Sequence, residues 1–221
     1  MRRGTAVRGI AKLTHLSADT GFSMGFGTLT FLLIVVALVV WFVAIFNRLV
    51  TLKNRYVNAF AQIEVQLKRR YDLIPNLIET AKGYLSHERG TLEAVVAARN
   101  QAVAGLSAAA KEPGNARAME QLGAAEGALG GALGRLNVVM EAYPDLKANQ
   151  TMMQLSEELT STENRVAFAR QSYNDQVTSY NTYKQTFPPV LFATFFGHGA
   201  DASLLEFEDH AAIQEAPKVK F

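Results

Sequence analysis

The sequence predicts an all-α protein in which one N-terminal transmembrane helix continues into a bundle of long helices. Residues 25–46 contain no charged side chain, and a helix that spans a bilayer needs roughly 20 apolar residues. The stretch 54–88 places apolar side chains at steps of three and four, the spacing that lines one face of an α-helix. The same spacing returns between residues 91 and 186, so the later helices can pack against the first.

The composition fits one soluble core behind a membrane anchor. The chain has 221 residues, of which 49% are hydrophobic and 19% charged, and these values are typical of a globular protein. A net charge of +2 gives no strong field for nucleic acid, so we expect no nucleic-acid partner. The absence of cysteine excludes disulfides, thiolate metal sites and cysteine nucleophiles.

Residues 1–24 are interpreted as a polar, basic tail, and residues 25–47 as the transmembrane helix. A cleaved signal peptide is the competing interpretation, but the apolar run is longer than a typical h-region and no A-x-A-like site follows it. Met24 directly precedes the span and is an alternative start to Met1. Basic residues flank the span almost equally in the full chain, whereas a start at Met24 favours a cytoplasmic bundle. We expect that orientation, with the other left open.

Four residues are predicted to lie at the membrane interface. Trp41 is at the C-terminal end of the apolar run, where aromatic rings prefer the headgroup region. Arg48, Lys53 and Arg55 follow it, and each cation contributes about 1 kcal/mol near an anionic leaflet. Membrane lipid is therefore an expected partner.

The helical bundle is assigned to residues 48–189, and residues 190–221 to a partly ordered tail. Pro75 lies inside the first helix of the bundle and removes a backbone hydrogen bond, so either a kink or a helix break is expected there. After a turn at 85–90, further helices are predicted over residues 91–110, over 116–141, and from 146–149 up to about 186, with turns at Pro113-Gly114 and Tyr143-Pro144 and a stop at Phe187-Pro188-Pro189.

Glycines in the predicted helix 116–141 need a compensating gain, because each costs about 1 kcal/mol relative to alanine. Gly123, Gly127 and Gly131 recur every four residues and would place small side chains on one face, where another helix can approach closely. A soft helix that moves is the alternative.

The short catalytic motifs in the sequence lack their required context. The G-x-S-x-G pattern at 21–25 adjoins the transmembrane helix, whereas a nucleophile elbow needs a strand before it. The pair His87-Glu88 lacks the second histidine of a zinc motif, because Thr91 stands at that position. We therefore predict no catalytic residue, no metal site and no cofactor.

Polar side chains beside the apolar stripes form the candidate site. Buried charges cost several kcal/mol unless they are paired, so we predict a structural polar network between helices. A polar groove that receives a partner or an ion is the alternative. The predicted members are Glu64, Arg70, Arg99, Glu163, Arg165, Arg170, Tyr173, Asn174, Tyr180 and Asn181.

Several long stretches resemble the LemA family of bacterial membrane-anchored proteins. They are AQIEVQLKRRYDLIPNLIETAKGYLSHE at 61–88, AAR at 97–99, EAYPDLKAN at 141–149, ENRVAFARQSYNDQVTSYN at 163–181 and the Phe187-Pro188 stop. The resemblance covers residues 47–189 and implies a long antiparallel helical bundle behind one spanning helix, without enzyme activity. Relatives are linked to envelope stress, membrane proteases and magnetosome membranes. The extension before Met24 departs from the short N-terminus usual in the family.

Two functions follow from these observations. The first is a non-enzymatic, membrane-anchored scaffold or adaptor of the bacterial inner membrane, which binds itself or another envelope membrane protein. The alternative is a lipid-binding or membrane-shaping module, which the apolar cluster at 190–196 and the basic residues after the span favour.

Overall fold

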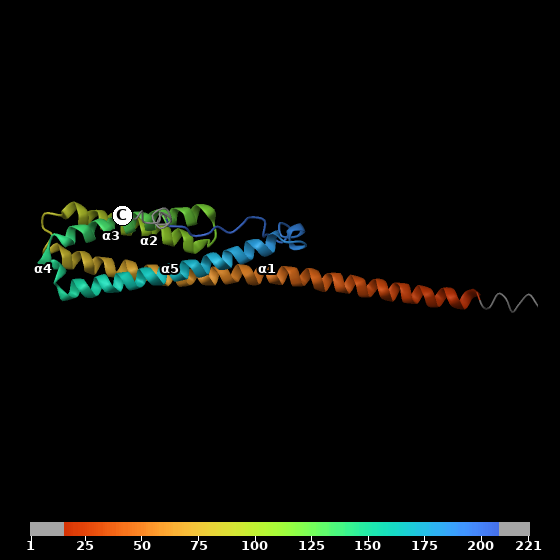
Figure 1. The fold of residues 1–221 in the computed structure, drawn as a ribbon. Coiled ribbons are helices and arrows are strands. Elements are labelled where there is room, and N and C mark those ends of the chain that lie inside the picture. Colours follow the sequence, from red (N-terminus) through yellow and green to blue (C-terminus); the bar gives the residue numbers. More distant parts are fainter. Residues whose placement is uncertain (1–15, 208–221) are drawn as a thin grey trace, which may run out of the picture. The chain divides into compact units, whose positions relative to one another are not determined.

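The computed structural model of the chain describes residues 16–207, with side chains from residue 26 onward (Figure 1). Residues 1–15 of the predicted tail lie outside the described part. The described residues form five α-helices and one short 3-10 helix, and contain no strand, which confirms the all-α prediction. The chain divides into two compact units between Arg48 and Leu49.

The N-terminal unit presents an apolar helix to its surroundings. Helix α1 (Leu16–Lys82) begins in this unit and is 67 residues long. Its apolar side chains are exposed, as shown by Phe31 at 69% and Val40 at 63%. Within the described part of the chain, α1 is the one helix long and apolar enough to cross a membrane. Such a surface is favourable in lipid and costly in water.

Helix α1 continues through Pro75 without a break, so the helix break considered from the sequence is wrong. Ile74 and Ile78 are both buried, while Pro75 itself is exposed. The proline therefore sits on the outer side of the helix, and the apolar stripe keeps its phase across it.

The three helices predicted after α1 are found in the predicted order, and a short helix, Pro144–Lys147, stands where a turn was predicted. Each boundary lies within a few residues of the prediction, and the predicted helix 116–141 is found with the same ends. The structure contains α2 (Arg89–Lys111), α3 (Ala116–Glu141), α4 (Pro144–Lys147), α5 (Gln150–Gln185) and the 3-10 helix η1 (Pro189–Leu191).

Asparagine side chains cap the starts of the two helices that follow turns. Asn115 Oδ1 accepts a hydrogen bond from the Ala118 amide at 3.2 Å, and Asn149 Oδ1 accepts one from the Met152 amide at 3.1 Å. Each cap satisfies a backbone donor that the helix itself leaves free. Gly114, before the first cap, has a φ of 89°, a conformation that favours glycine.

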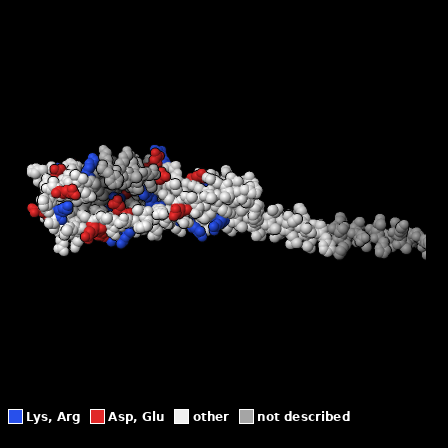
Figure 2. All heavy atoms as spheres, viewed as in Figure 1, with Lys and Arg blue, Asp and Glu red and all other residues white. Residues whose placement is uncertain are grey.

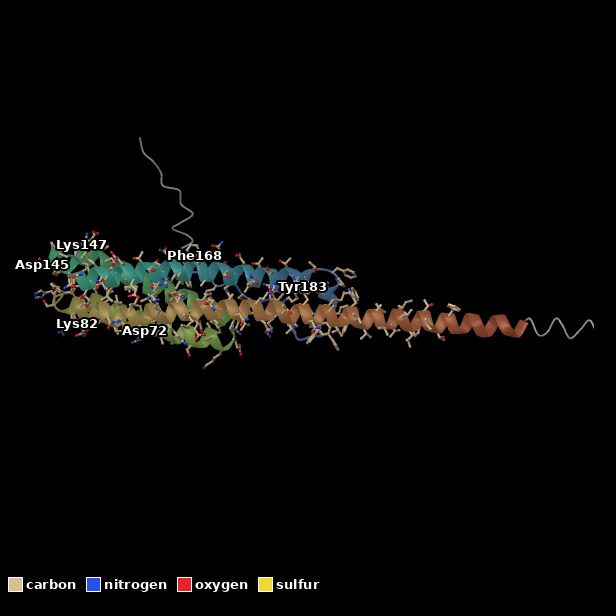
Figure 3. All side chains as sticks on the ribbon, turned by 90° about the horizontal axis from the view of Figure 1, so that it is seen from below. Asp72, Lys82, Asp145, Lys147, Phe168 and Tyr183 are labelled. Atoms are coloured by element: carbon tan, nitrogen blue, oxygen red, sulfur yellow. The ribbon has the colours of Figure 1, made fainter. Side chains whose placement is uncertain are left out.

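Helices α1 and α5 lie side by side and run antiparallel (Figures 1 and 3). The Tyr56 ring contacts the Tyr180 ring at 5.3 Å between centroids. Further along, Arg69 Nη2 pairs with Glu158 Oε1 at 2.6 Å. As the residue number rises along α1 it falls along α5, which confirms the antiparallel arrangement.

Helices α2 and α3 form a close second pair. A Cβ built on Gly105 of α2 would lie 3.4 Å from the Leu122 Cα of α3, so glycine permits the approach of the two backbones. The core lies between the two pairs. Its most completely buried side chains include Leu49, Phe60, Ile63, Leu67, Ile74, Leu77, Leu85, Met119, Leu122, Leu129, Leu136 and Tyr173.

The stretch after α5 is more integrated than a partly ordered tail implies, as far as residue 207. Ala193, Ala202, Leu205 and Phe207 are all buried. Residues 201–207 form no helix or strand and extend back along α5 toward the middle of the bundle (Figure 1). Part of the core therefore comes from residues that the sequence pattern assigned to the tail.

Candidate functional site

A buried ion pair joins α1 to α3 in the middle of the bundle. Arg70 Nη1 lies 3.2 Å from Glu126 Oε2, and these side chains are 8% and 1% exposed. The Tyr71 hydroxyl donates to the other carboxylate oxygen of Glu126 and lies 3.3 Å from the Ala102 carbonyl of α2. Breaking one side of such a pair is costly because the other charge stays buried. Three helices are therefore held in one register.

Burial and the neighbouring Glu126 carboxylate raise the pKa of Tyr71 far above its ordinary value of 10.0. Both causes disfavour the phenolate. Tyr71 therefore stays protonated and serves as a hydrogen-bond donor rather than as an acid or a base.

Arg99 of α2 compensates for Pro75. Proline has no N–H, so the carbonyl four residues earlier, that of Tyr71, loses its helical donor. Arg99 Nε donates to that carbonyl at 2.8 Å. The predicted network member Arg99 thus supplies from another helix the hydrogen bond that α1 cannot make itself.

Two asparagines of α5 bind the extended stretch 201–207, which we call the C-terminal strap. Asn181 accepts from the Ala202 amide at 3.0 Å and donates to the Ala202 carbonyl at 2.8 Å. Asn174 makes the same pair with Leu205, at 2.9 and 3.2 Å. Each side-chain amide therefore satisfies both backbone groups of one strap residue, as a neighbouring β-strand would.

The spacing of the two asparagines matches that of the strap. Seven residues of helix advance about 10.5 Å, and three extended residues advance about 10 Å. Asn174 and Asn181 are seven apart, and their partners Leu205 and Ala202 are three apart. The repeat seen in the sequence is therefore a ladder of strap-binding side chains.

The tyrosines that precede the two asparagines also bind the segment that follows α5. The Tyr173 hydroxyl donates to the Ser203 carbonyl at 2.8 Å. The Tyr180 hydroxyl and His198 Nδ1 share a hydrogen bond of 2.8 Å. Burial raises the pKa of Tyr180 to about 12, and burial together with Lys53 and Lys184 lowers the pKa of His198.

Lys184 fixes the loop that leads into the strap. Its side chain is 6% exposed, pairs with Asp201 and donates to the Gly199 carbonyl at 3.3 Å. A buried ammonium group needs such partners.

The remaining predicted members lie elsewhere. Glu64 pairs with Lys68 on the surface at 2.6 Å, and Arg165 is exposed. Glu163 is exposed and lines a groove between α3 and α5. Arg170 is half-buried, with its guanidinium 4.4 Å from the centre of the Phe207 ring, a cation–π contact.

Sequence reasoning missed Glu126, Lys184, His198 and Asp201. Glu126 had a visible signal, because it lies between Leu122 and Leu129 on the apolar face of α3. A carboxylate on such a stripe indicates a buried partner. The other three residues meet only after the chain turns back at η1, and the periodicity of the helices contains no information about that turn.

Gly123 and Gly131 of α3 do not make the close helix–helix approach that was predicted for them. A Cβ on Gly123 would collide with the Glu206 carbonyl oxygen of the strap, while Gly131 has no described atom within 4 Å of its Cβ position. The close approach at Gly123 is therefore made by an extended backbone.

The surface of the bundle carries charges of both signs, interspersed on the face seen in Figure 2. The four predicted interface residues, Trp41, Arg48, Lys53 and Arg55, are exposed. An exposed apolar cluster follows α5, with Phe187 at 77%, Leu191 at 64% and Phe195 at 82%. Among the described residues, no group of three His, Asp or Glu side chains has the arrangement of a metal site.

Comparison with known proteins identifies the family. A family model described as LemA family matches residues 59–221, well over half of the chain. The chain belongs to the LemA family. The resemblance seen in the sequence motifs is thereby confirmed, and the family pattern includes the strap and the residues after it.

Curated relatives carry two kinds of name. Protein LemA from Metamycoplasma hominis is 27% identical over 168 residues, which cover 76% of this chain and 72% of that protein. Magnetosome protein MamQ 2 from Paramagnetospirillum magneticum is 26% identical over 162 residues, covering 66% and 60%. Magnetosome protein MamQ from Magnetospirillum gryphiswaldense is 24% identical over 167 residues, covering 69% and 61%. This LemA-family chain thus spans about three-fifths of each MamQ relative.

Proposed function

We propose that this LemA-family chain is a non-enzymatic scaffold, anchored in the bacterial inner membrane by α1, that binds another envelope membrane protein or a second copy. The supporting observation is that its buried polar side chains bond to other parts of the bundle. Glu126, Tyr71 and Lys184 are bonded to other side chains or to backbone. These contacts support structural roles for the three side chains, because each holds two parts of the bundle together.

A surface for a partner is available where α3, α4 and α5 meet. Met140, Met152 and Met153 line an open pocket of about 380 Å³, and Met153 is 47% exposed. Methionine side chains are flexible and polarisable, which suits them to protein partners.

Affinity capture of the full chain from mild-detergent membranes tests this proposal. We expect a stoichiometric partner or a defined oligomer, lost in Met153→Asp and retained in Phe168→Asp. Phe168 is a matched control because it is 73% exposed on the outer side of α5 (Figure 3). A monomer with nothing bound would contradict the scaffold role, and equal capture by both variants would contradict this surface.

A second candidate function is lipid binding by the loop 187–196. Its exposed rings lie at the end of the bundle where the charge of Lys53 acts on His198. Apolar rings beside cations are suited to an anionic lipid surface.

Flotation of a chain that begins at Arg48, with vesicles containing anionic lipid, tests this candidate. We expect the chain to float with the lipid, and the double variant Phe187→Ser, Phe195→Ser to remain at the bottom. Phe168→Ser should float like the parent chain. A parent chain that does not float would rule out lipid binding by this loop.

A further inference from the structure

The C-terminal strap lies in a channel with two walls. Along one wall, Asn181, Asn174 and Arg170 of α5 meet Ala202, Leu205 and Phe207 in turn. Along the other wall, Gly123 of α3 leaves room for the Glu206 carbonyl. The strap therefore runs antiparallel to α5, and at Phe207 it points toward the N-terminal half of that helix.

The same two walls continue beyond Phe207 as an open groove, which we call the α3–α5 groove. It has a volume of about 260 Å³ and is lined by Gly130 and Gly134 of α3, Leu159 and Glu163 of α5, and Arg70 and Leu77 of α1. No described atom lies within 4 Å of a Cβ position on Gly130 or Gly134. An extended backbone can enter here as it does at Gly123.

The glycines of α3 follow the path of this channel. Gly123, Gly127, Gly130 and Gly134 recur at steps of four, three and four, which places them on one face of the helix. The first of them already accommodates the strap. Gly130 and Gly134 line the groove and extend the same face into it.

Arg170 provides a second and independent indication that the chain continues along the channel. Its Nη1 atom is buried and has no hydrogen-bond partner among the described residues. A buried guanidinium donor without a partner is costly. Glu208 and Asp209 come directly after Phe207, whose ring Arg170 covers, so a carboxylate is available at that point in the chain.

The length and composition of residues 208–221 would allow them to enter the α3–α5 groove. From Arg170 to Ser156, α5 advances about 21 Å, whereas residues 208–221 in extended form can reach roughly 45 Å. His210 follows the two acids, and the small side chains of Ala211 and Ala212 come next and suit a groove lined by glycine. The family match also continues to residue 221.

We propose that the α3–α5 groove is a binding site for the chain's own residues 208–213, which continue the strap past Gly130 and Gly134 with an acidic side chain on Arg170. The glycines of α3 are then the specificity determinant of a peptide-binding groove. This binding does not depend on the scaffold role.

Hydrogen–deuterium exchange of the full chain in detergent tests the proposal. We expect the amides of residues 208–213 to exchange at least tenfold more slowly than in the free peptide 208–221. Gly130→Leu with Gly134→Leu should abolish this protection. Gly131→Leu is the matched control, because Gly131 lies on α3 outside the groove, and it should leave protection unchanged. The proposal would be overturned if these amides exchanged at the free-peptide rate in the parent chain. It would also be overturned if they stayed protected in the Gly130→Leu, Gly134→Leu variant.

A designed cysteine pair identifies the occupant, since the natural chain has no cysteine. From Gly123 to Gly134, α3 advances about 16 Å, which five extended residues cover at about 3.3 Å each. Starting from Glu206, the residue opposite Gly134 is Ala211. Gly134→Cys with Ala211→Cys should therefore form a disulfide within one molecule. A disulfide-linked dimer would assign the groove to a second copy, and the absence of a disulfide would remove residues 208–213 from it.

Discussion

Arg99 and Pro75 form a coupled pair of single residues. The proline frees the Tyr71 carbonyl, and the arginine donates to it at 2.8 Å. We predict that Arg99→Met lowers the free energy of unfolding by about 1–2 kcal/mol in the parent chain. In a Pro75→Ala background the cost should fall by about 1 kcal/mol, because the alanine amide then donates to Tyr71.

A double-mutant cycle by denaturant unfolding measures this coupling. Arg165→Met is the control, because Arg165 is exposed on α5 and its loss should not depend on residue 75. Additive effects of Arg99→Met and Pro75→Ala would show that the Arg99 hydrogen bond does not compensate for proline.

Glu126 is the residue on which the centre of the bundle depends. Glu126→Ala leaves the Arg70 guanidinium buried without its carboxylate, a change expected to cost about 3–5 kcal/mol. Glu79→Ala removes a surface partner of Lys82 and should cost about 0–1 kcal/mol. Thermal unfolding of the two variants compares them, and equal melting temperatures would contradict the importance of the buried pair.

His198, in the loop before the strap, gives the stability of the bundle a dependence on pH. Its folded-state pKa lies below the ordinary value of 6.5, so the unfolded chain takes up the proton more readily. Its contribution to stability is therefore complete above about pH 6.5 and decreases as the pH falls toward the folded pKa.

The variant His198→Gln removes this contribution. The carboxylates titrate alike in both chains, so their effect cancels when the free energies of unfolding of parent and variant are subtracted. We predict that the stability advantage of the parent chain over the variant shrinks as the pH is lowered from 7 to 5, measured by denaturant midpoints. An advantage that stays constant would show that His198 does not titrate differently in the two states.

At the scale of elements, α5 is both a core helix and a receptor for an extended segment. Its apolar face contacts α1, and its Asn174 and Asn181 side chains bind the strap. This double role explains why the helix is long and polar. The apolar side chains position α5 in the core. The two asparagines, seven positions apart, determine where the strap lies.

We predict that Asn174→Ala and Asn181→Ala each cost about 1–2 kcal/mol, because the backbone groups of Leu205 or Ala202 lose both partners. Amide exchange at the affected strap residue should become faster in each variant. Gln171→Ala, an exposed change on the same helix, should alter neither quantity. Strap exchange that is unchanged in both asparagine variants would show that α5 does not hold the strap.

At the scale of the whole molecule, the orientation of the apolar run determines the face of the membrane on which the bundle lies. Arg48, Lys53 and Arg55 directly follow the apolar run, and basic residues next to a span favour its cytoplasmic end, so we predict a cytoplasmic bundle. A C-terminal epitope should then survive protease added to intact spheroplasts. Disrupted spheroplasts provide the control in which the epitope is cleaved, and cleavage in intact ones would place the bundle on the outer face.

Much of the architecture was predictable from local patterns. The apolar run, the three-and-four spacing and the Pro113-Gly114 turn gave a spanning helix and the bundle helices in order, because each pattern acts through nearby residues. A charge beside an apolar stripe needs a partner, and this argument predicts Arg70 and Arg99 as network members. In the structure Arg70 pairs with Glu126, and Arg99 donates to the Tyr71 carbonyl. The pattern could not identify Glu126 as the partner of Arg70. That pairing depends on how α1 and α3 are rotated relative to one another, and periodicity along one helix does not specify this.

The sequence by itself determined the helices, the family and the anchoring segment, all of which depend on short-range periodicity or on contiguous motifs. The tertiary structure alone decided that the residues after η1 return along α5, that the Tyr-Asn repeat binds them, and that Gly123 makes room for a backbone carbonyl. Those contacts join residues some 20 to 80 positions apart in the chain. Their free energy depends on a path through space, and local spacing does not specify that path.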